Sequence, residues 1–332
     1  MTRLGSAARS TFPLVAALVV SMGVLFAVGV DPFAYYWAVL DRGLLTARGL
    51  QETITRTAPL MLLSASLIVS FGAGLVNLGV DGQFILAAVA AAVVTPAMNV
   101  WLGQTPALLL GIGAAGLVGA LWSLLPALLR AQRGLNEAIS TLLMSYLGIS
   151  LANVLVKLLF HDPETTVPQT ATLPVIDRLP RLFGSTIHLG VPFALIVLLA
   201  THVVMTRGAW GLRARTLGAS ARVARHVGID VKGMTVAAMI VSGALAGLAG
   251  GVEIVGVWGN VRADWNPAYG FTVIPLVCLA RLNGWAAAAL VLMFATLTIG
   301  GESAGIRLGV PSQFVLVFAA MTLLFSLLSQ RR

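Results

Sequence analysis

Three side chains that carry carboxylate or amide groups, Asn77, Asp81 and Gln83, lie close together in a glycine-rich segment between two strongly apolar stretches. The preceding apolar stretch, 57–71, would reach only about 22 Å as an α-helix, and the hydrocarbon core of a bilayer is about 30 Å thick. We therefore expect the polar segment to dip into the membrane as a break between two helical arms. Polar groups are tolerated at that depth only against protein or a water-filled cavity, so the segment predicts a path for a polar solute. The alternative is a glycine-rich turn at the cytoplasmic surface, where Asp81 and Gln83 would be solvated.

A second group of candidate binding residues lies around the end of a later apolar stretch. Glu253 lies near the outer end of that stretch, and Trp258, Asn260 and Phe271 follow it. Carboxylates and amides can bond ribose hydroxyls and the edges of a nucleobase, and aromatic rings can stack on its face. We predict that these four residues belong to the same solute path as the glycine-rich segment. For each polar member, the alternative is a structural contact between helices.

The composition of the chain indicates that these residues belong to a membrane-spanning protein. Hydrophobic residues make up 58% of the 332 residues, charged residues only 10%, and the mean hydropathy is +0.94. We predict an all-α fold, a polytopic helical membrane bundle of about ten transmembrane helices, because apolar runs of near-spanning length alternate with short polar segments. The eighth run is short enough to be a half-helix or a re-entrant segment. The runs lie near 12–30, 57–71, 84–100, 106–129, 138–160, 189–206, 234–256, 270–280, 285–300 and 312–328.

The whole chain, 1–332, is expected to form one transmembrane domain, because its polar stretches are too short for a soluble core. Segment 31–56 is predicted to lie along the outer interface in contact with membrane lipid. The proline-containing segment 161–188 is predicted to be an external loop, and 207–233 a cytoplasmic one. With ten spans and both termini cytoplasmic, most basic residues fall on the inner side, as the positive-inside rule requires. This distribution accounts for the net charge of +9 without nucleic acid as a partner.

One short helix with a basic face is predicted within the cytoplasmic segment. Ser220 is a suitable N-cap and Gly228 a suitable stop, and the arginines between them share a face. A short helix at the cytoplasmic surface is typical of a docking element. The alternative is topological, since arginine accumulates in cytoplasmic loops whatever their function. The residues predicted to couple this segment to a partner are Gly218, Ser220, Arg222, Arg225, His226 and Gly228.

Several of these segments resemble one family of membrane proteins. Residues 77–83, Asn-Leu-Gly-Val-Asp-Gly-Gln, resemble the Asn-Ile-Gly-x-Glu-Gly-Gln signature of bacterial ATP-binding-cassette importer permeases of the ribose, nucleoside and branched-chain amino acid superfamily. Residues 135–141 are similar to the Asn-Glu-Val-Ile-x-Thr segment of its nucleoside and simple-sugar branch. Residues 218–229 resemble the segment that contacts the ATPase, with Ser220-Ala221 in place of Asn-Pro and His226 in place of Tyr. Residues 249–253 and 269–271 also resemble family positions, whereas 281–284 depart from them.

The resemblance runs from about residue 31 to 328. It implies the permease subunit of an importer that moves a nucleoside or a simple sugar into the cytoplasm. It further implies a second permease subunit in a heterodimer, cytoplasmic ATPases and an extracytoplasmic substrate-binding protein, at the cytoplasmic (inner) membrane of a bacterium or archaeon. The chain itself is expected to be no enzyme and to hold no cofactor. Neither Lys157 nor Lys232 belongs to a P-loop, so ATP is expected to bind a separate subunit.

Two other functions fit parts of the sequence. An ion-coupled secondary transporter would use Asp81 and Glu253 as coupling sites and would need no ATPase. An intramembrane serine hydrolase would use Ser303 of a Gly-Glu-Ser-Ala-Gly motif, with His188 or His202 as base, although the motif is expected in an external loop between helices. No metal site is expected, because the four histidines are scattered and no zinc-ligand spacing occurs.

Overall fold

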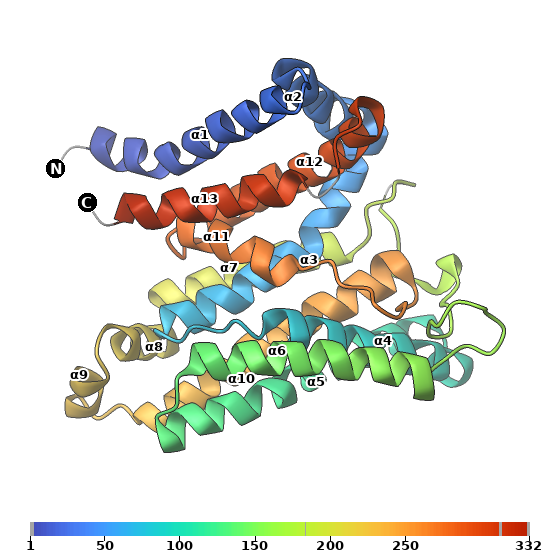
Figure 1. The fold of residues 1–332 in the computed structure, drawn as a ribbon. Helices are drawn as coiled ribbons and strands as arrows, with labels where there is room; N and C mark the ends of the chain where they lie inside the picture. The colour runs from blue at the N-terminus through green and yellow to red at the C-terminus, as the bar shows by residue number, and fades with distance from the viewer. Residues whose placement is uncertain (1–2, 183, 312–313, 331–332) are drawn as a thin grey trace. The chain divides into compact units, whose positions relative to one another are not determined.

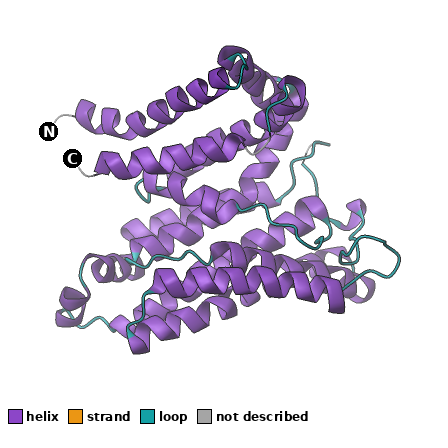
Figure 2. Ribbon diagram, in the orientation of Figure 1, coloured by secondary structure: helices purple, strands orange, loops and turns teal. Residues whose placement is uncertain are grey.

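The computed structural model describes residues 3–182, 184–311 and 314–330, and the regular structure within these ranges is helical (Figure 2). Seven of the described helices are long and apolar enough to cross a membrane. They are α3 (Ala47–Gly72), α4 (Val80–Leu102), α5 (Gln104–Arg133), α6 with its π-helical end η2 (Glu137–Leu159), α7 (Gly190–Arg207), α10 with its π-helical end η4 (Val231–Trp258) and α12 (Gly284–Leu308).

Each of the ten predicted spans corresponds to a helix. The three outside the set of seven are α1 (Arg3–Ala27), α11 (Tyr269–Leu279) and α13 (Phe314–Gln330). The helical membrane class is therefore confirmed, whereas the number of crossings and the side of each terminus stay predictions. The two chain ends, residues 1–2 and 331–332, lie outside the described residues.

The chain folds into two compact units. The first comprises 1–57, 184–187 and 272–332. Within it α1 and α13 lie side by side (Figure 1), and α2 (Pro32–Leu40) packs on α12. Gly300 of α12 makes this second contact possible, because a Cβ there would overlap the backbone of Val39.

The second unit comprises 58–183 and 188–271 and contains all the residues predicted to line the solute path or to couple to a partner. Its core is a bundle of α4, α5, α6 and α10 (Figure 1). Gly119 of α5 faces Gly243 and Gly247 of α10, and a Cβ on any of the three would overlap the backbone of the other helix. Such small residues let helices approach closely, which matters in a membrane because lipid offers no hydrophobic drive for helix association.

The prediction of a short helical arm before the glycine-rich segment is wrong. α3 has 26 residues and is about 39 Å long at 1.5 Å per residue. Its first turns include the mostly polar segment 51–56, in which Gln51, Glu52 and Arg56 are good helix formers. Segment 31–56, predicted to lie along the interface, comprises α2, the π-helical turn η1 (Asp41–Leu45) and the start of α3. Helix length therefore no longer places the break at a membrane depth, and its interpretation rests on its contacts.

The external loop predicted around Ser303 is also wrong, because α12 continues through the Gly-Glu-Ser-Ala-Gly motif to Leu308. The glycines do not end the helix, since they lie at tight packing positions. A Cβ on Gly301 would lie 2.7 Å from a methyl carbon of Val315. A serine-hydrolase elbow needs a strained strand-to-helix turn, which a continuous helix does not provide.

The two long connecting segments have the local structure predicted for them. Residues 161–188 are mostly irregular, with one 3-10 turn, η3 (Val175–Asp177), as their prolines favour. Residues 207–233 hold α8 (Ala209–Ala219) and the short helix α9 (Ala221–His226) before α10 begins. α9 is the short capped helix predicted from the sequence.

Candidate functional site

The glycine-rich break between α3 and α4 is held in place by one face of α6. α3 ends in a turn closed by Gly74, which has a φ of +71°. Three backbone N–H groups beyond this turn donate to side chains of α6. Leu78 donates to the Thr141 hydroxyl at 3.0 Å, and Gly82 donates to the Ser145 hydroxyl at 3.0 Å. Glu137, one turn earlier on the same face, accepts from Val76 at 3.5 Å and pairs with Arg130 at 3.2 Å.

Asn77 and Gln83 form a buried polar network at the centre of the break. Their exposed fractions are 0% and 1%. The Asn77 amide donates to Gln83 Oε1 at 3.2 Å and to the Ser242 hydroxyl of α10 at 3.0 Å. Ser242 also shares a hydrogen bond with Ser66 of α3 at 2.9 Å. The network thus joins α3, α4 and α10, and it satisfies polar groups that would be costly to bury unpaired.

Asp81 belongs to a different set of contacts from its two neighbours. Its carboxylate is 2% exposed and accepts backbone hydrogen bonds from Gly270 at 2.7 Å and from Phe271 at 3.2 Å. Both donors lie in the first turn of α11. The structure therefore brings Asn77 and Gln83 together but directs Asp81 to another helix.

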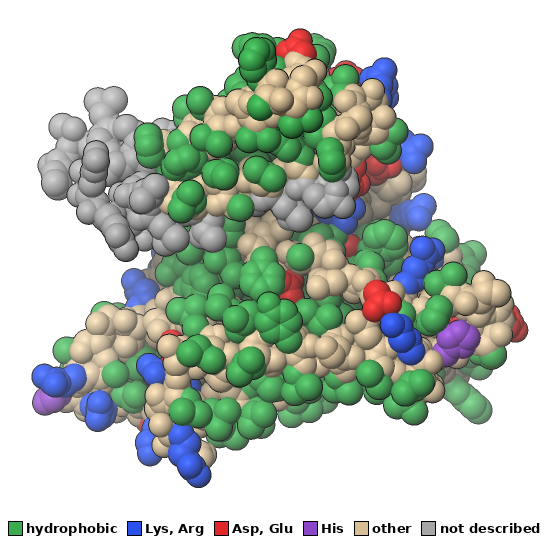
Figure 3. Space-filling model, in the orientation of Figure 1, with side chains coloured by type: hydrophobic (Ala, Val, Ile, Leu, Met, Phe, Trp, Pro, Cys, Tyr) green, Lys and Arg blue, Asp and Glu red, His purple; other side chains and the backbone are tan. Residues whose placement is uncertain are grey.

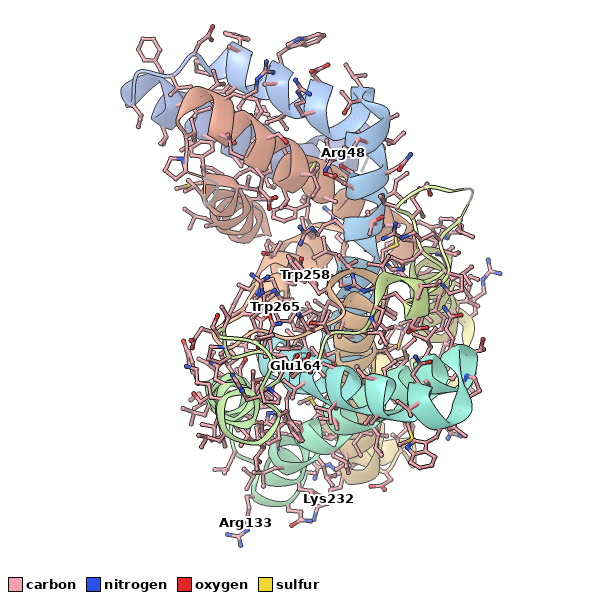
Figure 4. All side chains as sticks on the ribbon, turned by 90° about the vertical axis from the view of Figure 1, so that its right-hand side faces the viewer. Arg48, Arg133, Glu164, Lys232, Trp258 and Trp265 are labelled. Atoms are coloured by element: carbon pink, nitrogen blue, oxygen red, sulfur yellow. The ribbon has the colours of Figure 1, made fainter. Side chains whose placement is uncertain are left out.

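Glu253 is the centre of an aromatic cluster at the end of α10. Its Oε1 accepts from the Trp258 indole at 3.0 Å and from the Tyr269 hydroxyl at 3.2 Å. Ring centroids link Phe84 to Tyr269 at 5.6 Å and to Trp265 at 5.8 Å, with Trp258 and Trp265 separated by 6.3 Å. Figure 4 shows the two tryptophans next to each other. Glu253 is 1% exposed and Trp258 is 42% exposed, so the cluster combines a buried carboxylate with an accessible ring.

The other two predicted binding residues lie at the margin of this cluster. Phe271, in the first turn of α11, is 46% exposed. The Asn260 amide donates to the Thr172 hydroxyl at 2.9 Å, in segment 161–188. The sequence analysis assigned no binding role to Phe84, Trp265 or Tyr269. The available signals were the aromatic residues themselves, near the ends of apolar runs, and the resemblance of 269–271 to family positions. Among the described residues, no group of three His, Cys, Asp or Glu side chains could hold a metal ion.

Segment 161–188 is fastened to the chain on both sides of Trp258. Leu173 donates to the Gly259 carbonyl at 2.9 Å, and the Arg178 guanidinium donates to the carbonyls of Leu173 and Val257. Gly259 has a φ of +74°, and a Cβ there would overlap Arg178. Glycine is therefore needed both for this turn and for the close approach of the guanidinium.

His188, the last residue of the same segment, packs against the end of α10. It is 1% exposed, and its Nδ1 accepts from the Gly190 N–H at 3.1 Å. A Cβ on Gly256, two residues before Trp258, would lie 2.6 Å from the imidazole. Burial, together with the nearby charge of Arg181, lowers the pKa of His188 to about 4. The ring is therefore neutral at physiological pH.

The predicted coupling residues lie in α8, α9 and the turn that follows. The Ser220 hydroxyl accepts from the Val223 N–H at 3.3 Å, which confirms it as the N-cap of α9. Gly228 has a φ of +79°, which confirms the predicted stop. The side chains of Arg222, Arg225 and His226 are exposed. Lys and Arg side chains gather at this end of the molecule, around α8 and α9 (Figure 3).

Two further features adjoin α9. A cleft of about 400 Å³ lies between Arg213 of α8 and the residues from Val227 to Met234 that lead into α10. Gly218, near the end of α8, meets the break directly, since a Cβ on it would lie 2.7 Å from the backbone nitrogen of Gly74. The basic surface and the glycine-rich break are therefore joined by a contact between two backbones.

Comparison with known proteins finds similarity to the permease components of transporters. A family model described as the permease component of a branched-chain amino acid transport system matches residues 49–327. A glucose ABC transporter permease protein of Haloferax volcanii is 33% identical over 96% of this chain and 86% of its own length. A guanosine ABC transporter permease protein of Bacillus subtilis is 28% identical over 82% and 79% of the two chains. A nucleoside ABC transporter permease protein of Lactococcus lactis is 25% identical over 91% and 85%. No solved structure matches the chain.

Proposed function

Because the chain belongs to the family of permease components of branched-chain amino acid transport systems, we propose that it is the permease subunit of an ATP-binding-cassette importer for a nucleoside or a simple sugar. It is a multi-pass membrane protein and a transport subunit rather than an enzyme. ATP is bound and hydrolysed by a separate cytoplasmic subunit. A second, different permease completes the pathway, and an extracytoplasmic binding protein delivers the solute.

The substrate class rests on one observation, the half-exposed Trp258 ring beside the buried carboxylate of Glu253. An indole offers a flat apolar face to a sugar ring or a nucleobase, and both solutes carry hydroxyl groups that bond polar neighbours. Phe271 adds a second exposed ring, and Asn260 an amide. Asn77 and Gln83 are proposed to act on the pathway through the structure of the break, since they are buried and hydrogen-bonded within the chain.

The coupling residues are proposed to dock on the ATPase. Arg222 and Arg225 are exposed on a capped helix whose position relative to the break is fixed through Gly218. A basic face of this kind sets the register and orientation of an acidic partner surface. Replacing both arginines by Glu is expected to abolish ATP-dependent uptake while the melting temperature of the permease stays unchanged. Normal uptake by this double variant would contradict the assignment.

The proposed topology has ten crossings, with both termini and 207–233 on the cytoplasmic side, 161–188 outside and 31–56 along the outer interface. It treats 1–332 as one permease domain. Cysteine labelling of Ser220→Cys and Thr172→Cys in intact cells tests it. Reaction of the first from outside would contradict the topology.

Uptake into proteoliposomes tests the function. The complex of this chain with its ATPase, second permease and binding protein is offered radiolabelled guanosine, glucose, ribose or leucine. ATP-dependent uptake of guanosine or a sugar, with no leucine uptake, is expected. Uptake of leucine alone would contradict the substrate class. Uptake driven by an ion gradient without ATP would favour a secondary transporter instead.

A further inference from the structure

We propose that Asp81 is a positioning residue, which holds the first turn of α11 and thereby fixes the Tyr269 hydroxyl on Glu253. The inference rests on the proposed transport function and adds the residue that sets the geometry of its aromatic surface. It differs from the sequence-based expectation that Asp81 itself lines the solute path.

The first step of the argument is the cap on α11. The first N–H groups of a helix have no acceptor within it. Here the residue that precedes the helix, Ala268, has a φ of +53° and no side-chain acceptor. Both carboxylate oxygens of Asp81 take that place, one for Gly270 and one for Phe271. A carboxylate also complements the positive end of the helix dipole. The cap thus comes from a residue 189 positions away in sequence.

The second step is the close fit of Gly270 against α4. A Cβ on Gly270 would lie 2.5 Å from Val80 Cγ2 and 2.9 Å from Asp81 Oδ1. Any larger residue must push the carboxylate away from the helix end. Glycine at this position is therefore explained by the contact with Asp81.

The third step connects the cap to the aromatic surface. Tyr269 is adjacent to the capped residues, and its hydroxyl donates to Glu253. Its ring meets Phe84, which lies one turn after Asp81 on α4. α4 therefore holds the start of α11 at two points, by the carboxylate on the backbone and by a ring on Tyr269. Without the carboxylate, one of these two points of support for the tyrosine is lost and the ring contact with Phe84 remains.

Asp81 is only 2% exposed, and a solute that displaced Gly270 and Phe271 from its carboxylate would leave two backbone donors unpaired. Leaving buried donors unpaired is costly, so a role through α11 fits the contacts better than direct contact with solute.

Two variants remove the cap by different routes. Asp81→Ala deletes the acceptors, and Gly270→Ala displaces them. Asp31→Ala is the matched control, because the Asp31 carboxylate also caps a helix, accepting from Phe33 at 2.9 Å in α2. Amide hydrogen exchange in the purified complex is followed in peptides that cover the start of α11. Both test variants are expected to exchange there at least about tenfold faster, and the control at the wild-type rate.

Uptake by the reconstituted complex then separates positioning from general stability. Asp81→Ala is expected to lower uptake about tenfold at equal membrane abundance, and Tyr269→Phe about threefold. If Asp81 acts through Tyr269, the double variant is no worse than Asp81→Ala alone, whereas independent effects would multiply. Asp81→Asn, which retains one acceptor oxygen, is expected to recover part of the activity.

Two results would overturn the proposal: unchanged exchange at α11 in both test variants, or multiplicative loss in the double variant. Failure of the wild-type complex to transport any offered solute would count against the proposed function instead. The exchange measurement would still decide whether Asp81 holds α11.

Discussion

The glycine-rich break and the Glu253 cluster lie in the same unit but expose their functional groups differently. Asn77, Asp81 and Gln83 are at most 2% exposed, and each is hydrogen-bonded within the chain. Around Glu253, in contrast, Trp258 and Phe271 leave more than two fifths of their surface open. Polar groups in an apolar chain can therefore hold helices together or meet a solute. Exposure distinguishes the two roles where residue type does not.

The largest expected effect on stability is at the break itself. Gly74→Ala adds a Cβ 2.6 Å from the Gly218 backbone at a φ of +71°. Left-handed backbone and overpacking together are expected to cost about 3 kcal/mol or more. Gly134→Ala is the control, since it has a similar φ of +66° but no atom within 4 Å of the new Cβ. Thermal unfolding in detergent compares them, and equal losses would show that the close contact is unimportant.

Low pH is expected to lower the stability of the fold through protonation of His188, which packs near the Glu253 cluster. Its pKa of about 4 in the folded chain lies below the ordinary value of 6.5. The unfolded chain therefore binds the proton more readily, and stability is lost as the pH falls from about 6.5 toward 4. The loss is at most about 3 kcal/mol. His188→Gln, which stays neutral, should flatten the dependence of the melting temperature on pH. The exposed His161→Gln should leave it unchanged, and a flat wild-type profile would contradict the prediction.

Asn77→Ala tests the buried network of the break. It leaves the Gln83 amide without its Asn77 partner and removes one of the hydrogen bonds of Ser242, which is expected to cost about 1–3 kcal/mol. The melting temperature should fall, and uptake should fall only as far as membrane abundance does. Loss of uptake at full stability and abundance would show that Asn77 meets the solute after all.

Trp258→Ala tests the exposed side of the comparison. About 1–3 kcal/mol should be lost, because a large part of the ring is already open but its indole donates to the buried Glu253 carboxylate. Uptake is expected to fall about tenfold through the lost stacking surface. Trp101→Ala, at an indole that is 82% exposed elsewhere in the same unit, is the control and should transport normally. The comparison would fail if the two tryptophan variants behaved alike.

Local signals predicted much of what the structure shows. The glycines of the break predict it, and an N-cap serine and a glycine that ends the helix predict α9. Contacts between distant residues could not be predicted in the same way. The donors to Asp81 lie on a helix 189 residues away, and the donors to Glu253 include Tyr269, which belongs to another helix. The helices α3 and α12 are longer than the sequence predicts. Polar residues and glycines end a helix only where packing does not favour its continuation.

The contact between Gly218 and Gly74 has a mechanical consequence. Side chains that meet across a helix interface can change rotamer and absorb a small displacement, but two backbones in contact have no such freedom. A displacement of α8 is therefore passed directly to the end of α3. If an ATPase docks at α9 as proposed, its movement would reach the glycine-rich break through this contact.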